Sequence, residues 1–216
     1  MSPAPVKTCG PGRPKDPEKR AAILDAAKRL FPQWGFEGTS MDAIASEAGV
    51  SKLTVYSHFT DKETLFFCAI RARCEEQMPE TLFDVDRQLP LRDQLAAIGH
   101  AFIALVSTPE ALSLHRLLVS GTGMPQKLVD LFLEAGPERV RSGFEQYLSR
   151  HIAAGRFEIG DVARAAQQFF ALLKGEWHAR QLCGCSQPLD QRDIDAQVRA
   201  SVDMFLRAYA RDAPPA

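Results

Sequence analysis

Apolar residues recur at helical spacing along almost the whole chain, and the stretch between residues 39 and 62 is especially regular. Met41 and Ile44 lie on one helical face, and Val55 and Phe59 lie on another. Gly49 stands between the two faces, and a glycine there can adopt the positive φ that ends a helix. The pattern therefore predicts two short helices joined by a tight turn.

The second of these helices keeps its polar side chains outward. Ser51 is placed to cap it, as Thr39 or Ser40 is placed to cap the first helix. The positions that its apolar face leaves mostly outward are Lys52, Thr54, Tyr56, Ser57 and His58. A short exposed helix with many hydrogen-bond donors and a cation, braced by the preceding helix, fits a DNA major groove. We therefore predict a helix-turn-helix.

A longer helix is expected before this pair. Asp16 can cap it and Pro17 suits the first helical position, after which apolar residues follow helical spacing as far as Trp34. Gly35 should end the helix, and Pro32 should kink or tighten its last turn. Three such helices would bury one small core. They predict a DNA-binding domain over residues 16–63.

Proline and glycine dominate residues 1–15, so no helix is expected there. Arg13 or Lys15 could follow DNA phosphates from such a flexible arm, as mobile cations in other DNA-binding arms do. The alternative is a solvated tail without a role, and the residues alone leave both open.

The remainder, residues 64–216, predicts helices only, and no alternating strand pattern or fixed-period repeat occurs. Proline and glycine breakers, among them Gly136-Pro137, separate the expected helices. These run from Lys62 to about Met78 and over about 91–107, 109–120, 126–135, 137–154, 161–182 and 190–211. The fold class is therefore all-α, with the larger helical domain following the DNA-binding unit.

The last two helices are the most apolar. The final one carries a stripe made of Ile194, Val198, Val202, Phe205, Leu206 and Tyr209. These residues could pack only within their own domain, or they could build an interface with a second copy. We favour a homodimer, because a twofold pair of recognition helices spans half-sites ~34 Å apart.

The composition limits the classes of protein to which the chain can belong. The 216 residues carry a formal net charge of −1, which argues against non-specific coating of nucleic acid. The N-terminus lacks an apolar signal region and no stretch approaches the roughly 18 apolar residues of a membrane span, so we expect a cytoplasmic protein that needs no membrane. Five cysteines in a reducing compartment are expected to be free thiols.

The run VSKLTVYSHFTDKETLF resembles the recognition segment of the TetR/AcrR family of transcriptional repressors. The residues that match the family pattern are Val50, Ser51, Lys52, Thr54, Tyr56, His58, Phe59, Lys62, Glu63 and Leu65. Leu53 replaces a small residue, Ser57 occupies a variable position, and Thr60-Asp61 replaces Pro-Ser. These departures concern operator sequence rather than fold.

The resemblance implies a role for each residue of the segment. Phosphate contacts fix the register of the protein on DNA and base contacts give specificity. Lys52, Leu53 and Thr54 are placed to meet base edges, although Lys52 could bind a phosphate instead. By the resemblance, Tyr56, His58 and Lys62 hold the DNA backbone, and Thr39 is the hydroxyl that contacts a phosphate before the first helix of the pair. Tyr56 and His58 could also be packing residues. The full set expected at the DNA is Thr39, Ser40, Ser51, Lys52, Leu53, Thr54, Tyr56, Ser57, His58 and Lys62.

The family resemblance also implies a cavity in the larger domain, where a small molecule causes release from the operator. Aromatic, Met and His side chains suit an apolar or aromatic effector, and control of an efflux system is common in the family. The candidate lining residues are Cys74, Met78, His100, Phe102, His115, Met124, Phe144, Phe170, Trp177 and His178. Each of them could equally be plain core.

No catalytic motif, phosphate-binding loop or metal-ligand spacing occurs, so we expect neither an enzyme nor a cofactor. Cys183-Gly184-Cys185 leaves a different alternative open, namely a thiol-based redox sensor that uses the same DNA-binding module. A helical carrier or enzyme whose helix-turn-helix is incidental is a further alternative. It would bury Lys52, Tyr56 and Lys62 rather than expose them on one face.

Overall fold

The computed structural model describes residues 16–84, 89–119, 125–185 and 190–211. Within these ranges the chain is helical apart from its connections and one isolated bridge between Phe157 and Ala210. The predicted all-α fold is confirmed. The predicted arm over residues 1–15, with Arg13 and Lys15, lies outside the described residues.

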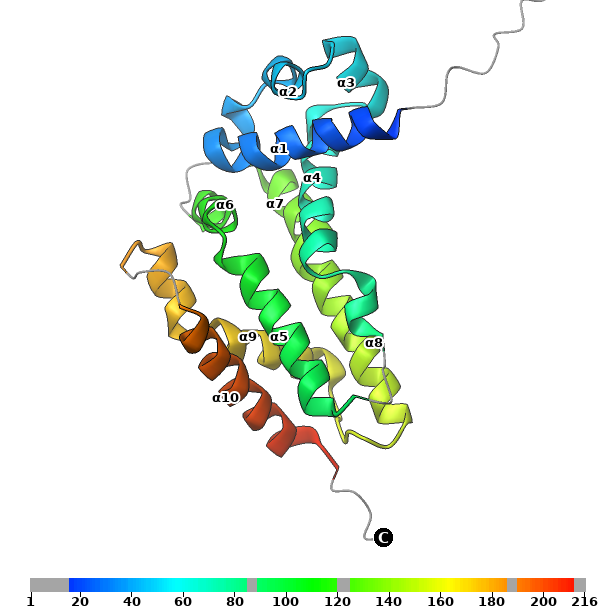
Figure 1. Cartoon of the computed structure of the whole chain (residues 1–216), viewed down its shortest axis with the longest axis vertical. Helices are drawn as coiled ribbons and strands as arrows, with labels where there is room; N and C mark the ends of the chain where they lie inside the picture. Colours follow the sequence, from blue (N-terminus) through cyan, green and yellow to red (C-terminus); the bar gives the residue numbers. More distant parts are fainter. Residues whose placement is uncertain (1–15, 85–88, 120–124, 186–189, 212–216) are drawn as a thin grey trace, which may run out of the picture.

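The helices follow the predicted order, with the first three gathered at one end of the molecule and α4 leading into the larger part (Figure 1). The elements are α1 (Pro17–Gly38), α2 (Met41–Glu47), α3 (Lys52–His58), α4 (Lys62–Gln77), η1 (Glu80–Phe83), α5 (Leu91–Ser107), α6 (Pro109–Val119), α7 (Gln126–Leu133), η2 (Glu134–Glu138), α8 (Arg139–Ala153), α9 (Val162–Leu182) and α10 (Gln191–Tyr209).

Two side-chain caps and a glycine turn define the helix-turn-helix. The Ser40 hydroxyl accepts a hydrogen bond from the Ala43 amide at 3.0 Å, so Ser40 rather than Thr39 caps α2. The Ser51 hydroxyl accepts from the Thr54 amide at 3.1 Å and caps α3. Gly49 has a φ of 65° in the turn, a conformation that a residue with a Cβ rarely adopts. Both capping side chains therefore satisfy amides that the first helical turn leaves unpaired.

Two predicted boundaries differ from the structure. Gly35 has a non-helical φ of 71°, but the helical turns of α1 resume and end at Gly38. Trp34 is 49% exposed and does not belong to the core. Gly136 and Pro137 do not separate two helices, because they lie in a π-helical turn that joins α7 to α8. A π turn accommodates the proline by widening the helix rather than ending it.

Helix α1 packs against both parts of the molecule. Ile23, Ala26 and Leu30 are buried, and the helix contacts α2 and α3 as well as α4 and α6. The Ser113 hydroxyl of α6 donates to the carbonyl oxygen of Pro32 at 2.7 Å. One continuous apolar cluster therefore extends from the DNA-binding unit into the larger helical part.

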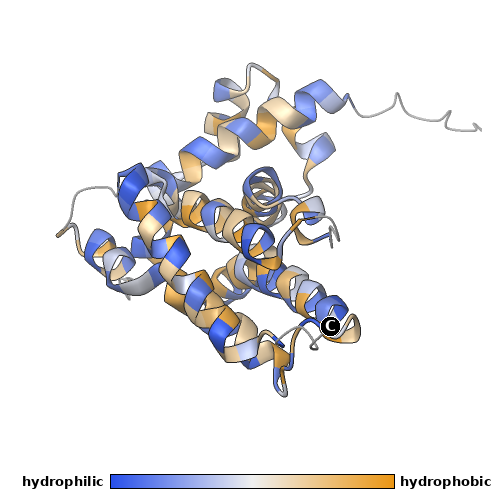
Figure 2. Ribbon diagram, turned by 60° about the horizontal axis from the view of Figure 1, so that its bottom comes forward, coloured by the Kyte–Doolittle hydropathy of each residue, from blue (hydrophilic) through white to orange (hydrophobic). Residues whose placement is uncertain are grey.

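The apolar stripe predicted on the last helix packs within the subunit. Val198, Val202 and Phe205 of α10 are buried, and α10 packs on α5 and α9. Of the two alternatives for this stripe, packing within its own domain describes its buried residues, and the homodimer stays a prediction. Figure 2 shows hydrophobic and hydrophilic residues alternating along the helices.

No single helix in the described ranges is long and apolar enough to cross a membrane. By length and hydropathy alone, α5 and α6 meet the requirement together, but they are bent by 67° at their junction. Both helices supply residues to the apolar core.

His151 is fully buried in the aromatic part of this core. Its ring lies 4.4 Å from that of Tyr147 and 5.8 Å from that of Phe157, measured between centroids. Neither ring nitrogen has a hydrogen-bond partner within the described ranges. Burial, followed by the positive charges of Arg156 and Arg150, lowers the pKa of His151 from 6.5 to about 4.

Acidification should therefore destabilise the fold through this residue. The unfolded chain binds the proton at pH 5 and the folded chain does not, so stability falls as the pH drops from the unfolded pKa of 6.5 toward about 4. We expect the change from pH 7 to pH 5 to cost the wild type about 1–2 kcal/mol more than His151→Phe. Urea unfolding followed by circular dichroism measures this. His100→Gln, at a half-exposed histidine, should retain the wild-type loss, and an equal loss in His151→Phe would contradict the assignment.

Candidate DNA-binding surface and ligand cavity

Helix α3 presents one polar face because its apolar side is used for packing. Val55 and the following Phe59 are buried against α1 and α2. Leu53 is 79% exposed and Tyr56 is 44% exposed, while Lys52 and Ser57 are also outward. Figure 1 shows α2 and α3 at the end of the molecule, away from α8 and α10. This surface can enter a groove without rearrangement of the core.

The N-terminal turn of α3 contains two hydroxyls and one cation. Ser51 Oγ and Thr54 Oγ1 are 2.8 Å apart and share a hydrogen bond. Lys52 Nζ lies 2.8 Å from Asp42 Oδ2, and that hydrogen bond raises the pKa of the lysine. Asp42 is a functional neighbour that the sequence reasoning missed. Its position in the first turn of α2 gave no sign that it would reach Lys52 on the next helix.

The prediction that Thr39 offers its hydroxyl to DNA is wrong. The residue is fully buried, and its Oγ1 donates to the carbonyl oxygen of Gly35 at 2.7 Å and lies 3.2 Å from that of Leu30. The threonine hydroxyl is thus directed toward carbonyl groups of α1 beside the irregular turn at Gly35. Ser40, by contrast, is exposed beside it.

The other predicted contacts have mixed environments. Lys62 Nζ donates to the Phe36 carbonyl oxygen at 2.8 Å and lies 4.2 Å from the centre of the Phe36 ring, so it ties the start of α4 to the end of α1. Ser57 Oγ donates to the Thr54 carbonyl oxygen at 2.7 Å. His58 is half-buried beside Phe59. Lys62 and His58 therefore have internal contacts in addition to any contact with DNA.

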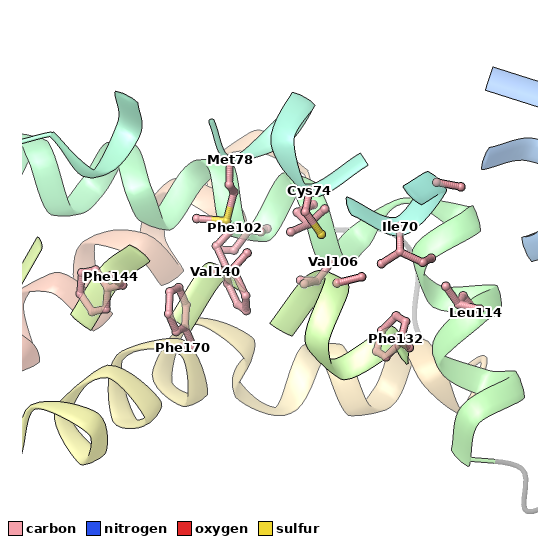
Figure 3. Packing of buried hydrophobic residues seen from close by; sticks show 14 of the residues in the cluster. Ile70, Cys74, Met78, Phe102, Val106, Leu114, Phe132, Val140, Phe144 and Phe170 are labelled. Carbon is pink, nitrogen blue, oxygen red and sulfur yellow. The ribbon is translucent and has the colours of Figure 1, made fainter. Parts of the chain in front are cut away.

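A cavity of about 500 Å³ lies between α1, α4, α5, α6, α7, η2, α8 and α9. Four of the predicted effector residues line it, namely Cys74, Phe102, His115 and Phe170. Figure 3 shows Cys74, Phe102 and Phe170 among the side chains of this region, with Ile70 and Phe132 near them. The wall is largely apolar, as small-molecule sites usually are.

Five of the other predicted effector residues do not line the cavity. Met78 and Phe144 are fully buried core residues. His100 faces α10, with Nε2 2.9 Å from Asp195 Oδ1. Trp177 donates to the Leu173 carbonyl oxygen at 3.0 Å, and His178 packs behind His115 with ring centres 5.6 Å apart. Met124 lies outside the described residues.

The sequence reasoning missed the contribution of the first helix to this cavity. Ala27, Lys28, Phe31 and Pro32 of α1 line its wall, together with Lys174 of α9. A sequence gives the buried face of a helix but not the helix that will cover it. Pro32 was the one signal available, since a proline within a helix marks an irregular turn.

The cysteines in the described ranges are free thiols. Burial raises the pKa of the Cys74 thiol to about 11, which keeps it protonated at neutral pH. Cys183 and Cys185 are exposed free thiols, with Cys185 Sγ 3.5 Å from the carbonyl oxygen of Cys183. No group of three His, Cys, Asp or Glu residues that could hold a metal ion occurs in the described part of the chain. The thiol-sensor reading stays a hypothesis.

Comparison with known proteins gives two family matches. Residues 93–211 match the family described as AefR-like transcriptional repressor, C-terminal domain, which is more than half of the chain. Residues 23–68 match bacterial regulatory proteins, tetR family. The second match includes the whole of α2 and α3.

Individual relatives agree with these matches. A TetR-family regulator from Mesorhizobium loti has a TM-score of 0.75 at 28% identity, over 92% of this chain and all of that one. The flavonoid-responsive regulator FrrA has a TM-score of 0.71 at 32% identity, with the same coverage. BetI from Agrobacterium fabrum is 28% identical over 90% of this chain and 91% of its own length. RutR from Escherichia coli is 41% identical, but the match spans only 34% of that protein and 33% of this chain.

The matched proteins are transcriptional regulators rather than enzymes, in agreement with the class predicted from the recognition segment. The exposed polar face of α3, the internal cavity and the two family matches lead to one conclusion. The chain belongs to the TetR family of DNA-binding transcriptional regulators.

Proposed function

We propose that this regulator is a homodimeric repressor that leaves its operator when a small apolar or aromatic molecule fills the cavity. The observation that carries the proposal is the composition of the cavity wall. Phe31 and Pro32 belong to α1 and to the cavity, while α1 also packs on α2 and α3. A ligand in the cavity would therefore contact the helix that supports the DNA-binding surface.

The proposed mechanism is a two-state equilibrium. A ligand shifts such an equilibrium only by binding one state better than the other. Residues of α1, α4, α6 and α9 line the cavity, so its filling would favour a wider separation of these helices. Because α1 and α4 carry the DNA-binding unit, the wider state would hold α3 in a different place from the state that fits the operator.

The relatives support a small aromatic effector. The name of FrrA states that it responds to flavonoids, and this chain is 32% identical to it. The rings of Phe31, Phe102, Phe132 and Phe170 line the cavity here. We propose an efflux system for such compounds as the regulated target, because removal of the effector would restore repression.

We propose that the DNA-binding unit spans residues 16–63 and that the effector and dimer domain spans 64–216. For the dimer, the outward face of α10 replaces the buried stripe as the proposed surface. Ala196, Ala200 and Met204 follow a four-residue spacing on that face, and Met204 is 57% exposed. Small side chains let two helices approach closely, and a large exposed apolar residue in a charged surface favours a partner.

Thr54→Ala tests base readout. The side chain lies at the start of α3, where its methyl group or hydroxyl can meet a base edge. We expect the preference for one operator base pair to change by about 1–3 kcal/mol, while binding of random duplexes stays the same. Competition binding with single-substituted operators measures this. An unchanged preference would make Thr54 part of the scaffold only.

Lys62→Met tests phosphate contact, because the methionine keeps the apolar packing on Phe36 and removes the charge. We expect operator and random duplexes to lose affinity about equally, with the slope of log K against log salt smaller by about one. Binding titrations at several salt concentrations measure both quantities. Arg192→Met, on α10 and remote from α3, should leave the slope unchanged, whereas a loss confined to the operator would refute the assignment.

Ala200→Glu tests the dimer surface, because a carboxylate on this face would be buried by a partner helix. We expect the variant to sediment as a monomer and to lose most of its operator affinity. Analytical ultracentrifugation gives the molecular mass. Ala21→Glu, at an exposed alanine of α1, is the matched control and should stay dimeric. A dimeric Ala200→Glu would move the interface elsewhere.

A further inference from the structure

One charged residue of the cavity wall stands apart from the others. Lys174 of α9 is half-buried, and its Nζ lies 5.9 Å from the centre of the Phe102 ring. The structure gives this ammonium no ion pair and no hydrogen bond within the described ranges. Burial lowers the pKa of Lys174. A cation that is partly withdrawn from water and has no counter-charge is unfavourable unless a partner arrives.

The backbone holds Lys174 in this place. Gly175, the next residue, has a φ of 50° and interrupts the helical conformation of α9. Gln197 of α10 donates through Nε2 to the carbonyl oxygen of Leu172 at 2.6 Å, next to this interruption. A Cβ at Gly175 would lie 3.1 Å from that same Nε2. The interruption and its hydrogen bond therefore fix the chain on both sides of Lys174.

The other cations of the wall already have acidic partners. Lys28 Nζ lies 2.6 Å from Asp25 and 2.5 Å from Glu76. Its pKa is lowered by burial but raised overall by these hydrogen bonds. The Arg73 guanidinium is 3.0 Å from a carboxylate oxygen of Glu110.

Arg141 is the last of the paired cations in the cavity wall, and its Nε lies 3.2 Å from Glu145 Oε1. Glu138 lies at the exposed edge of the cavity, on η2. His115 adds no positive charge at neutral pH, because burial and then the nearby Lys174 lower its pKa from 6.5. The uncompensated charge in the cavity is therefore the ammonium of Lys174.

We propose that the cavity selects an amphipathic carboxylate, with its acidic group on Lys174 and its hydrocarbon or aromatic body along Phe102, Phe132 and Phe170. This inference rests on the proposed role of the cavity as the effector site. It narrows the class of effector from any small apolar or aromatic molecule to one that also carries an acidic group. A neutral ligand would leave the ammonium unpaired, and an amine would add a second positive charge beside it.

Two matched sets of probes separate the head group from the body. One set is decanoate, decanol and decylamine, and the other is naphthylacetate, naphthylethanol and naphthylethylamine. Calorimetric titration of the full chain gives the affinity of each probe. In the wild type we expect the acid of a set to bind about 10- to 100-fold more tightly than the alcohol, as for a charged hydrogen bond.

Variants of Lys174 assign the preference to this residue. Lys174→Met and Lys174→Gln should both bind acid and alcohol about equally and should still bind the alcohol, whereas Lys174→Arg should retain the preference for the acid. Lys127→Met is the matched control, since Lys127 is an exposed lysine of α7 that pairs with Glu63 outside the cavity. It should behave as the wild type. Circular dichroism confirms that each variant is folded.

The outcomes separate this inference from the proposed function. Equal binding of acid and alcohol by the wild type, or an acid preference that survives Lys174→Met and Lys174→Gln, would overturn the role of Lys174. Either result leaves a cavity that binds neutral molecules. Loss of the acid preference in both variants would support the role of Lys174 even if no probe released DNA. In that case the proposed effector role of the cavity would fail instead. Absence of binding by every probe overturns both.

Discussion

The structure depends on the burial of α1 between two sets of helices. Phe31 packs its ring against those of Phe36 and Phe66, with centres 5.9 Å and 5.2 Å away. Phe66 belongs to α4, so the same contact closes the small core beneath α2 and α3 and begins the larger one. Burial of apolar surface is the dominant favourable term in folding, and here it does not divide into two independent cores. A change at one end of α1 must therefore be accommodated at the other.

This shared helix is the basis of the effector role that we propose for the cavity. Pro32 lines the cavity and accepts a hydrogen bond from Ser113 of α6, while the residues that follow it lead directly to the capped start of α2. Packed interiors resist continuous deformation and move between discrete arrangements. A ligand that fits one arrangement better would therefore shift α1 and α4. These helices would carry the change to the DNA-binding unit without a separate linker.

Features that depend on neighbouring residues in sequence could be predicted, and features that depend on helix pairing could not. The caps at Ser40 and Ser51 and the turn at Gly49 follow from local hydrogen bonding and backbone freedom, so they were accessible from the sequence. The burial of Thr39 goes with contacts of its hydroxyl to the carbonyl oxygens of Leu30 and Gly35, beside an irregular turn that the sequence alone does not specify. The position of Lys174 in the cavity wall depends on packing among α4, α5, α6 and α9.

We propose that cavity occupancy and operator binding are coupled through α1 and α4. Coupling is reciprocal, so an operator that disfavours the ligand-bound state must weaken ligand binding by the same factor. Titration with the fluorescent probe anilinonaphthalene sulfonate, in the presence of a saturating duplex selected from a random DNA pool, tests this directly. The account predicts affinity for the probe about 5- to 150-fold weaker than with a scrambled duplex. Equal affinity with the two duplexes would contradict it.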